Sequence, residues 1–319
     1  MLRNLWPFSR TPTFRDLTSQ WLDEARSRLR PKWHNEAKRL SERDLAPLRS
    51  QRADRITRRE VSRILTAIES PAMANKCQAV VSVVFSWAIA TGRLDCGNPA
   101  KGLRKRPVPS RERTLSEAEL SRVWTASMEL EDYGRIVRLL LLTGQRRDEI
   151  GALRWSEISI ERREVSLPGS RTKNRRSHIV PLSPLAIAQL PDRRGDSDYL
   201  FGRFQGRSFG GWSKCKARLD KALGHDMQHW LLHDLRRTFV TQCAELGIAE
   251  PHIIEACVNH ISGHRAGVAG VYNRATYSAA KRAALERWAD EVRRIVGATD
   301  QRPGGFPLAA LVTPRPSIR

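Results

Sequence analysis

A stretch rich in proline and basic residues, KGLRKRPVPSRER at residues 101–113, divides the chain into two segments with different hydrophobic patterns. Because proline and a dense run of positive charge disfavour regular structure, we predict a linker here. The segment before it has only helix-type periodicity, whereas the segment after it changes for a short distance to a period of two residues. The sequence therefore predicts a helical domain followed by a larger domain that contains a small sheet.

The first segment carries four helical patterns, which begin near Thr13, residue 31, Thr57 and Ser70. Thr13 and Thr57 are each followed three residues later by an acidic residue, and Ser70 precedes a proline, all of which are signals of a helix N-terminus. We expect the second helix to cover residues 31–50 with a break near Pro47. The fourth should bury Ala79, Val80, Val83, Val84 and Trp87. Together they predict a compact bundle at residues 13–100, after an extension of residues 1–12.

In the second segment, residues 114–296, an apolar run at residues 136–142 predicts a core helix that Gly144 ends. The period changes at EVSLP and HIVPL, which flank a basic turn and predict a β-hairpin with Lys173 near its tip. Residues 199–201 are expected to add a third strand. The fold class is mainly α with a small antiparallel β-sheet, that is, a helical bundle plus an α+β domain. Residues 297–319, rich in proline and glycine, predict a flexible tail.

The charge of the chain favours a nucleic-acid partner. The net charge is +22 and the isoelectric point is about 10.9. Residues 1–113 contain 24 Lys and Arg against 11 Asp and Glu, which leaves 32 against 23 for the rest. Both segments are basic, and the first is the more densely charged. An excess of this size indicates a phosphate-bearing polymer rather than a small acidic metabolite, and we expect the first segment to grip DNA.

Cysteine content and hydropathy indicate where the protein works. The five cysteines are odd in number and show no metal-ligand spacing, which is typical of a reducing, intracellular setting. We find no apolar run that approaches the ~18 to 20 residues of a membrane span, and no continuous apolar core of a signal peptide. We therefore expect a cytoplasmic protein without a membrane partner.

Several residues of the second segment could act on a phosphodiester. His233 and Arg236 stand three apart at the start of a helical pattern, so they share a face that suits an anion, and Tyr272 is a phenol able to act as a nucleophile. Cleavage without a metal ion needs cationic groups to neutralise the transition state, and Arg146 and Lys173 supply more of them. Carboxylate clusters for two metals and a phosphate loop are absent, so no metal or nucleotide cofactor is expected. Taken singly, each residue also has an ordinary structural interpretation.

Taken in chain order, five motifs resemble those of the tyrosine recombinase (phage integrase) family. They are TGQRRDE around Arg146, TKN around Lys173, HDLRRT from His233, VNH at His260 and VYNR around Tyr272. The resemblance covers residues 114 to about 290. Residues 13–100 are similar to the core-binding domain of the family only in position, helix content and charge.

The resemblance implies a role for each reactive group. Arg146 and Arg236 would clamp the scissile phosphate, with Glu149 supporting Arg146. Tyr272 would attack the phosphate, and Lys173 would protonate the leaving 5′ oxygen. These roles describe a site-specific DNA recombinase, an integrase that cuts and rejoins DNA through a 3′-phosphotyrosyl intermediate.

The proton-handling residues implied by the resemblance are His233 and His260, and the second departs from the family pattern. An asparagine precedes His260 where much of the family has glycine, and the nucleophile follows twelve residues later, a longer gap than in many members. His264 is therefore an alternative to His260, and Tyr277 is a weaker alternative to the proposed nucleophile. The choice between the two histidines stays open.

The family also implies partners. These are double-stranded DNA with attachment sites, a homotetramer on that DNA and an accessory directionality factor, in a nucleoid-associated cytoplasmic location. Many related integrases carry an additional N-terminal arm-binding domain, for which residues 1–12 leave no room, so we expect a short member or a truncated copy. Two alternatives remain: DNA relaxation like that of a type IB topoisomerase, and a catalytically idle DNA-binding remnant of an integrase.

Overall fold

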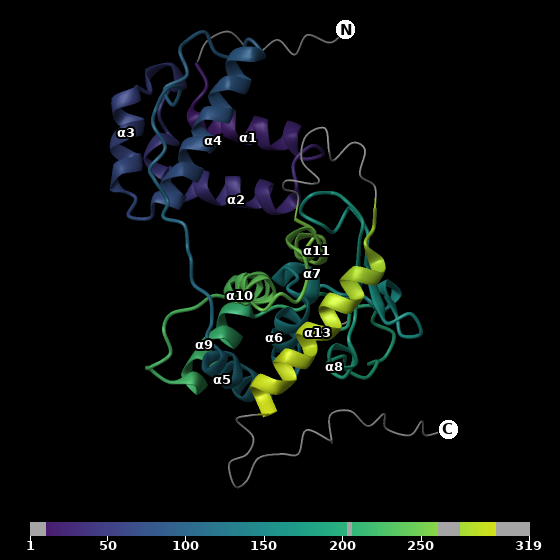
Figure 1. The fold of residues 1–319 in the computed structure, drawn as a ribbon. Coiled ribbons are helices and arrows are strands. Elements are labelled where there is room, and N and C mark those ends of the chain that lie inside the picture. The colour runs from purple at the N-terminus through teal and green to yellow at the C-terminus, as the bar shows by residue number, and fades with distance from the viewer. Residues whose placement is uncertain (1–10, 203–205, 261–274, 298–319) are drawn as a thin grey trace. The chain divides into compact units, whose positions relative to one another are not determined.

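The computed structural model describes residues 11–202, 206–260 and 275–297 (Figure 1). The chain separates into two compact units between Arg111 and Glu112. Both units are built mainly from helices, and the second contains a three-stranded antiparallel sheet. The expected fold class is thereby confirmed.

The first unit is a helical bundle with α4 at its centre, in contact with each of the other three helices. Its helices are α1 (Phe14–Ala25), α2 (Pro31–Glu42), α3 (Arg58–Ala67) and α4 (Pro71–Ala90), and the 3-10 turns η1 (Ala46–Leu48) and η2 (Ala53–Arg55) join α2 to α3. At the start of α1, the hydroxyl of Thr13 accepts from Asp16 N, while the Asp16 carboxylate accepts from Thr13 N at 3.0 Å. This reciprocal cap confirms the helix start expected from the sequence.

Two expectations for this unit were wrong. Helix α2 ends at Glu42 rather than near residue 50, and Pro47 lies in η1. Proline has no N–H for a continuing α-helix, and the tighter turn buries Leu45 and Leu48 completely. In α4, Val80 and Val84 are buried as expected, but Ala79 and Val83 are exposed, because a helix this apolar has no single hydrophobic face that the sequence pattern could define.

Helix α4 also qualifies the statement that no apolar run reaches the length of a membrane span. It has 20 residues and an 18-residue window with a mean hydropathy of 1.2, so by length and composition alone it could cross a membrane. Its buried side chains, which include Cys77, Val81 and Phe85, pack into the core of the first unit. Core packing accounts for its composition.

The start of the basic, proline-rich stretch is attached to the first unit. Gln78 Nε2 donates to the carbonyl of Leu103 at 2.7 Å, and the Asn75 side chain exchanges two hydrogen bonds of 2.8 Å with the backbone of Arg106. The Arg106 guanidinium in turn donates to the carbonyls of Ile68 and nearby residues at the end of α3. Residues 103–106 are therefore part of the folded unit.

In the second unit, α6 runs through the core and packs against several other helices. The helices are α5 (Glu117–Ser127), α6 (Glu131–Thr143), α7 (Arg147–Gly151), α8 (Pro184–Ile187), α9 (Trp212–Leu223), α10 (Leu232–Glu245), α11 (Pro251–Cys257) and α13 (Ser278–Gly297), with the 3-10 turn η3 (Trp155–Glu157). Every residue from Ile136 to Leu142 is buried, as expected. Phe239 of α10 and Trp288 of α13 pack edge to face at 5.7 Å and fix these helices against the core.

The sheet consists of β1 (Ile158–Ser159), β2 (Glu164–Leu167) and β3 (His178–Pro181), in that order. Strands β2 and β3 form the expected hairpin, with Val165 opposite Val180. The third strand expected at residues 199–201 was wrong. Tyr199 forms a single bridge with Arg154, and Leu200 N donates to the carbonyl of Leu153 at 2.9 Å, so this segment pairs with the chain after α7 instead of the hairpin.

Gly144 ends α6 in the left-handed region, with φ of 64°, and a Cβ there would lie 2.6 Å from Phe239 Cδ1. We predict that Gly144→Ala lowers the free energy of unfolding by about 2–4 kcal/mol, because backbone strain and overpacking add. Denaturant unfolding would measure the change. Gly247→Ala is the matched control, because Gly247 has φ of 57° and open space around it, so only about 1–2 kcal/mol is expected. Equal losses in both variants would rule out crowding by Phe239.

Candidate active site

The first element of the site is the turn from α6 into α7, which carries Arg146. Arg146 precedes the first residue of α7, and its backbone N–H donates to Glu149 Oε2 at 3.0 Å. Its guanidinium donates to Glu149 Oε1 at 2.9 Å, and the Glu149 side chain is only 3% exposed. One buried carboxylate therefore fixes both the backbone and the side chain of Arg146.

The second element is α10, which carries Arg236 in a buried position. The guanidinium donates to the carbonyl of Gly144 at 3.0 Å and to that of Val258 at 2.7 Å. Burial lowers the pKa of Arg236 to about 10, and the neighbouring positive charge of Arg146 acts in the same direction. Arg236 thus stays charged at neutral pH. Because both acceptors are neutral carbonyls, they orient the guanidinium without cancelling its charge.

His233 lies on the exposed side of the first turn of α10. Its pKa lies below the usual value because of partial burial, and the positive charges of Arg236 and Arg237 act in the same direction. The imidazole is therefore mainly neutral at neutral pH, the state that can accept a proton. The next residue, Asp234, is fully buried, accepts from Leu231 N at 2.8 Å and pairs with Arg237 at 2.5 Å.

The C-terminal end of α11 connects these elements. Helix ends have carbonyls without partners inside the helix, and here side chains from other elements bond to them. We call the carbonyls of Cys257, Val258 and Asn259 the α11 carbonyl row. The carbonyl of Cys257 accepts from Gln145 Nε2 at 2.8 Å and is 3.0 Å from His178 Nε2. The next carbonyl, Val258, holds Arg236.

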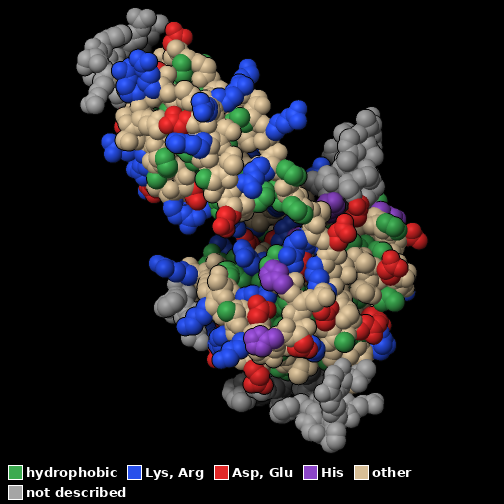
Figure 2. Space-filling view, turned by 90° about the vertical axis from the view of Figure 1, so that its left-hand side faces the viewer, with side chains coloured by type: hydrophobic (Ala, Val, Ile, Leu, Met, Phe, Trp, Pro, Cys, Tyr) green, Lys and Arg blue, Asp and Glu red, His purple; other side chains and the backbone are tan. Residues whose placement is uncertain are grey.

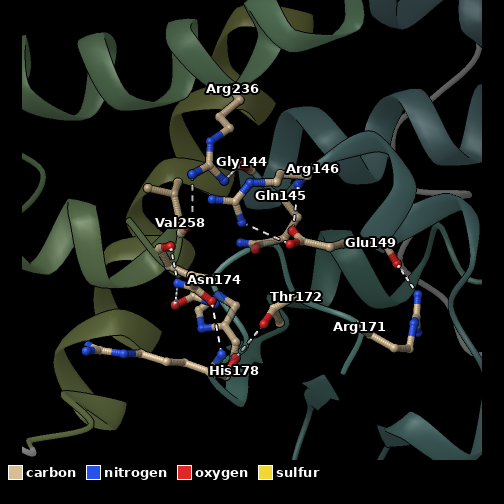
Figure 3. A network of polar contacts seen from close by, with 12 residues as sticks. Gly144, Gln145, Arg146, Glu149, Arg171, Thr172, Asn174, His178, Arg236 and Val258 are labelled. Carbon is tan, nitrogen blue, oxygen red and sulfur yellow. Dashed lines mark hydrogen bonds and ion pairs between the residues drawn. The ribbon is translucent and has the colours of Figure 1, made fainter. Parts of the chain in front are cut away.

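The third carbonyl of the row, that of Asn259, accepts from Asn174 Nδ2 at 3.1 Å. Asn174 lies on the turn between β2 and β3, next to Lys173, which is exposed. At the start of the same turn, Arg171 donates to the backbone carbonyl of Glu149 at 3.0 Å. Figure 3 shows how these contacts bring the turn, α7, α10 and the end of α11 together. The structure therefore brings Arg146, Glu149 and Arg236 together and ties the Lys173 turn to them.

His178 is buried in β3 and contacts the carbonyl of Cys257. Burial lowers its pKa to about 3, and the positive charge of nearby Lys281 acts in the same direction. In the unfolded chain the same group titrates near 6.5. Between these values the unfolded state binds more protons, so folding stability is lost as the pH falls below about 6.5.

We predict that below pH 6 the free energy of unfolding of the wild type decreases with falling pH more steeply than that of His178→Gln. The expected difference in slope is about 1.4 kcal/mol per pH unit. Denaturant unfolding between pH 7.5 and 5 would measure both slopes, and parallel slopes would contradict the prediction.

The remaining expected residues lie in, or next to, residues 261–274, which are outside the described ranges. His260 is exposed and its Nδ1 lies 3.7 Å from Glu255 Oε1. His264 and Tyr272 lie outside the described residues. Tyr277, the alternative nucleophile, is half-buried just before α13 and packs edge to face on His252 at 5.3 Å. The roles of all four stay predictions.

Sequence reasoning missed the residues that hold the site together. These are Gln145, Asn174, His178 and Asn259, each of which contributes a side chain at the α11 carbonyl row. The sequence offers one signal, the asparagine that stands before His260 where much of the family has glycine. Its φ is 51°, a conformation that asparagine adopts more readily than most residues.

The surface of the first unit is basic. Figure 2 shows Lys and Arg side chains spread over the face of this unit that is in view. The net charge of the whole chain is +22 at pH 7. Such a surface complements a polyanion.

Comparison with known proteins agrees with both units. Residues 113–278 match the phage integrase family, and residues 14–106 match the phage integrase central domain. The chain belongs to the phage integrase family. The match to the central domain also covers the residues up to Arg106 that are attached to the first unit.

Curated members of the integrase family are similar over much of the chain. Prophage integrase IntZ of Escherichia coli (strain K12) is 32% identical over 276 residues, 80% of this chain and 65% of its own length. The integrase of Shigella phage Sf6 is 27% identical over 68% of this chain and 58% of its own length. The chain therefore spans less than two thirds of the length of these relatives.

Solved integrase structures share the fold. A lambda integrase dimer bound to a COC′ core site aligns with a TM-score of 0.65 and 17% identity, covering 79% of this chain and 96% of that one. A lambda integrase tetramer bound to a Holliday junction aligns with a TM-score of 0.63 and 16% identity, covering 82% and 85%. At these identities the similarity supports the fold.

Proposed function

We propose that this member of the phage integrase family is a site-specific DNA recombinase, which cuts and rejoins double-stranded DNA through a 3′-phosphotyrosyl intermediate. The observation that carries the proposal is the convergence of two guanidinium groups. Arg146 is braced by buried Glu149, and Arg236 is oriented by two neutral carbonyls. Arg236 lies close enough to Arg146 for the positive charge of Arg146 to lower its pKa. Two adjacent positive charges held in fixed directions suit a phosphodiester that becomes more negative as it reacts.

In this mechanism, the phenol oxygen of Tyr272 attacks the scissile phosphorus while the bond from phosphorus to the 5′ oxygen breaks. The two guanidiniums stabilise the charge on the non-bridging oxygens. Lys173 gives a proton to the leaving 5′ oxygen, and neutral His233 accepts the proton of the phenol. The phosphotyrosyl bond keeps the step reversible, so a 5′ hydroxyl of another strand can displace the tyrosine.

The relatives support the partners that we propose. Prophage integrases and a shufflon-specific DNA recombinase are among the similar proteins. In the solved structures, lambda integrase is bound to DNA as a dimer and as a tetramer. We propose that this chain acts on DNA attachment sites as a homotetramer, with the basic first unit as the core-binding domain. A nucleoid-associated cytoplasmic location and an accessory directionality factor complete the proposal.

The test uses a pool of nicked duplexes with a randomised core, in which the nick lets the cleaved fragment diffuse away and traps the covalent complex. Adducts are isolated under denaturing conditions, their DNA is sequenced, and the modified peptide is identified by mass spectrometry. The proposal expects enrichment of one core sequence and a modified peptide that contains Tyr272. Adducts with no enriched sequence, together with relaxation of supercoiled plasmid by dilute protein, would favour a topoisomerase. DNA binding without any adduct would favour an idle remnant.

A further inference from the structure

Asn259 occupies a backbone position at which glycine is the default residue. Its φ is 51°, and the residue is 2% exposed. Asparagine is among the few residues with a side chain that adopt the left-handed region at low cost. The position therefore keeps its backbone conformation while presenting a side chain toward the site, which a glycine would not do.

That side chain pairs with Asn174, which is 85 residues away in the sequence. Asn174 Nδ2 donates to Asn259 Oδ1 at 2.8 Å, and Asn259 Nδ2 donates back to Asn174 Oδ1 at 3.3 Å. The same Asn174 Nδ2 also donates to the backbone carbonyl of Asn259 at 3.1 Å. We call these two residues the asparagine pair. It joins the turn between β2 and β3 to the end of α11 by three hydrogen bonds.

The turn itself is built around Asn174. Arg176 N donates to Asn174 Oδ1 at 3.2 Å, and the hydroxyl of Thr172 donates to the carbonyl of Arg176 at 2.8 Å. Thr172 is 1% exposed, whereas Lys173, which lies between Thr172 and Asn174, is exposed. The inward side chains on both sides of Lys173 therefore fix the backbone from which it projects.

The asparagine pair connects two residues to which the family resemblance gives proton-handling roles with the proposed phosphate-binding groups. Lys173 directly precedes Asn174, and His260 directly follows Asn259. The carbonyl before Asn259, that of Val258, orients Arg236 (Figure 3). The position of the Lys173 turn is thus set relative to the arginine that would hold the scissile phosphate.

We propose that Asn174 and Asn259 are positioning residues that hold the Lys173 turn where the lysine ammonium reaches the leaving 5′ oxygen. This inference rests on the proposed function, because it assigns the pair a task in DNA cleavage. In the step concerned, the bond from tyrosine oxygen to phosphorus forms, the bond from phosphorus to the 5′ oxygen breaks, and the proton of the lysine ammonium goes to that oxygen. Without the pair the turn samples other positions, and proton transfer slows before phosphate binding is affected.

A substrate with sulfur in place of the bridging 5′ oxygen separates this role from a general structural one. A thiolate is a good leaving group because a thiol has a pKa near 8.5, so its departure needs no general acid. A defect in proton transfer is therefore relieved by the sulfur substrate, whereas a defect in the arginines or the fold persists on it. The measured quantity is the ratio of single-turnover adduct rates on the sulfur and the oxygen substrate, both built on the core sequence selected from the pool.

We expect Lys173→Ala to raise this ratio by about 10²- to 10⁴-fold over wild type, the usual contribution of a general acid. Asn174→Ala, which removes all three bonds of the pair, should raise it about ten- to hundredfold through slower cleavage of the oxygen substrate. Asn259→Gly keeps the backbone conformation and its carbonyl, so a smaller rise is expected. The control is Asn98→Ala, because Asn98 makes a similar set of turn hydrogen bonds in the first unit, and its ratio should match wild type.

Three outcomes would overturn the inference. One is an Asn174→Ala variant that cleaves both substrates like wild type, and another is a variant that is slowed equally on both. The third is a Lys173→Ala variant that sulfur does not relieve. In each case wild-type adduct formation leaves the proposed function standing, whereas a wild type that forms no adduct on either substrate removes the proposed function as well.

Discussion

Tyr272→Phe is expected to abolish the covalent protein–DNA adduct, while Tyr277→Phe retains at least half of it. Phenylalanine keeps the size of the ring but lacks the oxygen that forms the bond to phosphorus, so no residual covalent chemistry is expected. The measurement is adduct formation on the nicked substrate selected from the pool, with DNA binding followed in parallel. Binding should be unchanged within about threefold in both variants, because one phenol oxygen contributes little to contacts dominated by phosphate charge.

The described tyrosines all make contacts within the second unit. The chain has four tyrosines, and three of them lie in the described residues. Tyr133 is 3% exposed and stacks on Phe209, and burial raises the pKa of its phenol. The Tyr199 hydroxyl accepts from Arg154 at 3.0 Å. Tyr277 is packed on a histidine ring of α11. An adduct that survives Tyr272→Phe and disappears in Tyr277→Phe would reverse the assignment.

Arg236→Lys is expected to lower the rate of adduct formation by about 10²- to 10³-fold, the usual effect of removing one preorganised donor to a developing charge. Lysine keeps the positive charge but lacks the planar fork that bonds to the carbonyls of Gly144 and Val258 at the same time. The direction of the group is therefore lost although its charge remains. Single-turnover cleavage at saturating enzyme would measure this effect separately from DNA binding.

The matched control for this variant lies on the same helix. Arg237 pairs with the buried carboxylate of Asp234, a bond that lysine can also make, so Arg237→Lys should stay within about threefold of wild type. Arg236→Lys should also lower the free energy of unfolding by about 1–3 kcal/mol, because two buried carbonyls lose donors. Both rates are therefore compared under conditions in which the variants are fully folded. Equal rates for the two variants would contradict the role given to Arg236.

Most of the fold could be predicted because its signals are local. The caps at Thr13 and Thr57, the apolar run that forms α6 and the change of period at the hairpin each depend on neighbouring residues, and each matches the structure. The errors arose where tertiary contacts decide. The predicted third strand was wrong because residues 199–201 pair with the chain after α7. The composition of these residues does not determine which segment they pair with.

The candidate site was predictable to the extent that charged side chains identify it. Arg146, Glu149 and Arg236 stand in recognisable patterns, and the structure brings them together. The other side chains that bond to the α11 carbonyl row were not predictable, because their partners are backbone groups and leave no trace in residue identity. By residue type alone, Asn174 and His178 are ordinary residues of a turn and a strand.

The α11 carbonyl row also determines which changes this part of the chain can tolerate during evolution. Every residue type carries a carbonyl, so exchanges at Cys257 and Val258 that preserve their packing leave the bonds to Gln145 and Arg236 in place. A change of length has a different outcome. Inserting or deleting one residue in α11 rotates its end by about 100° and shifts it by about 1.5 Å, which moves all three acceptors away from their donors at once. Members of the family with this arrangement should therefore vary in residue type along the end of this helix but keep its length.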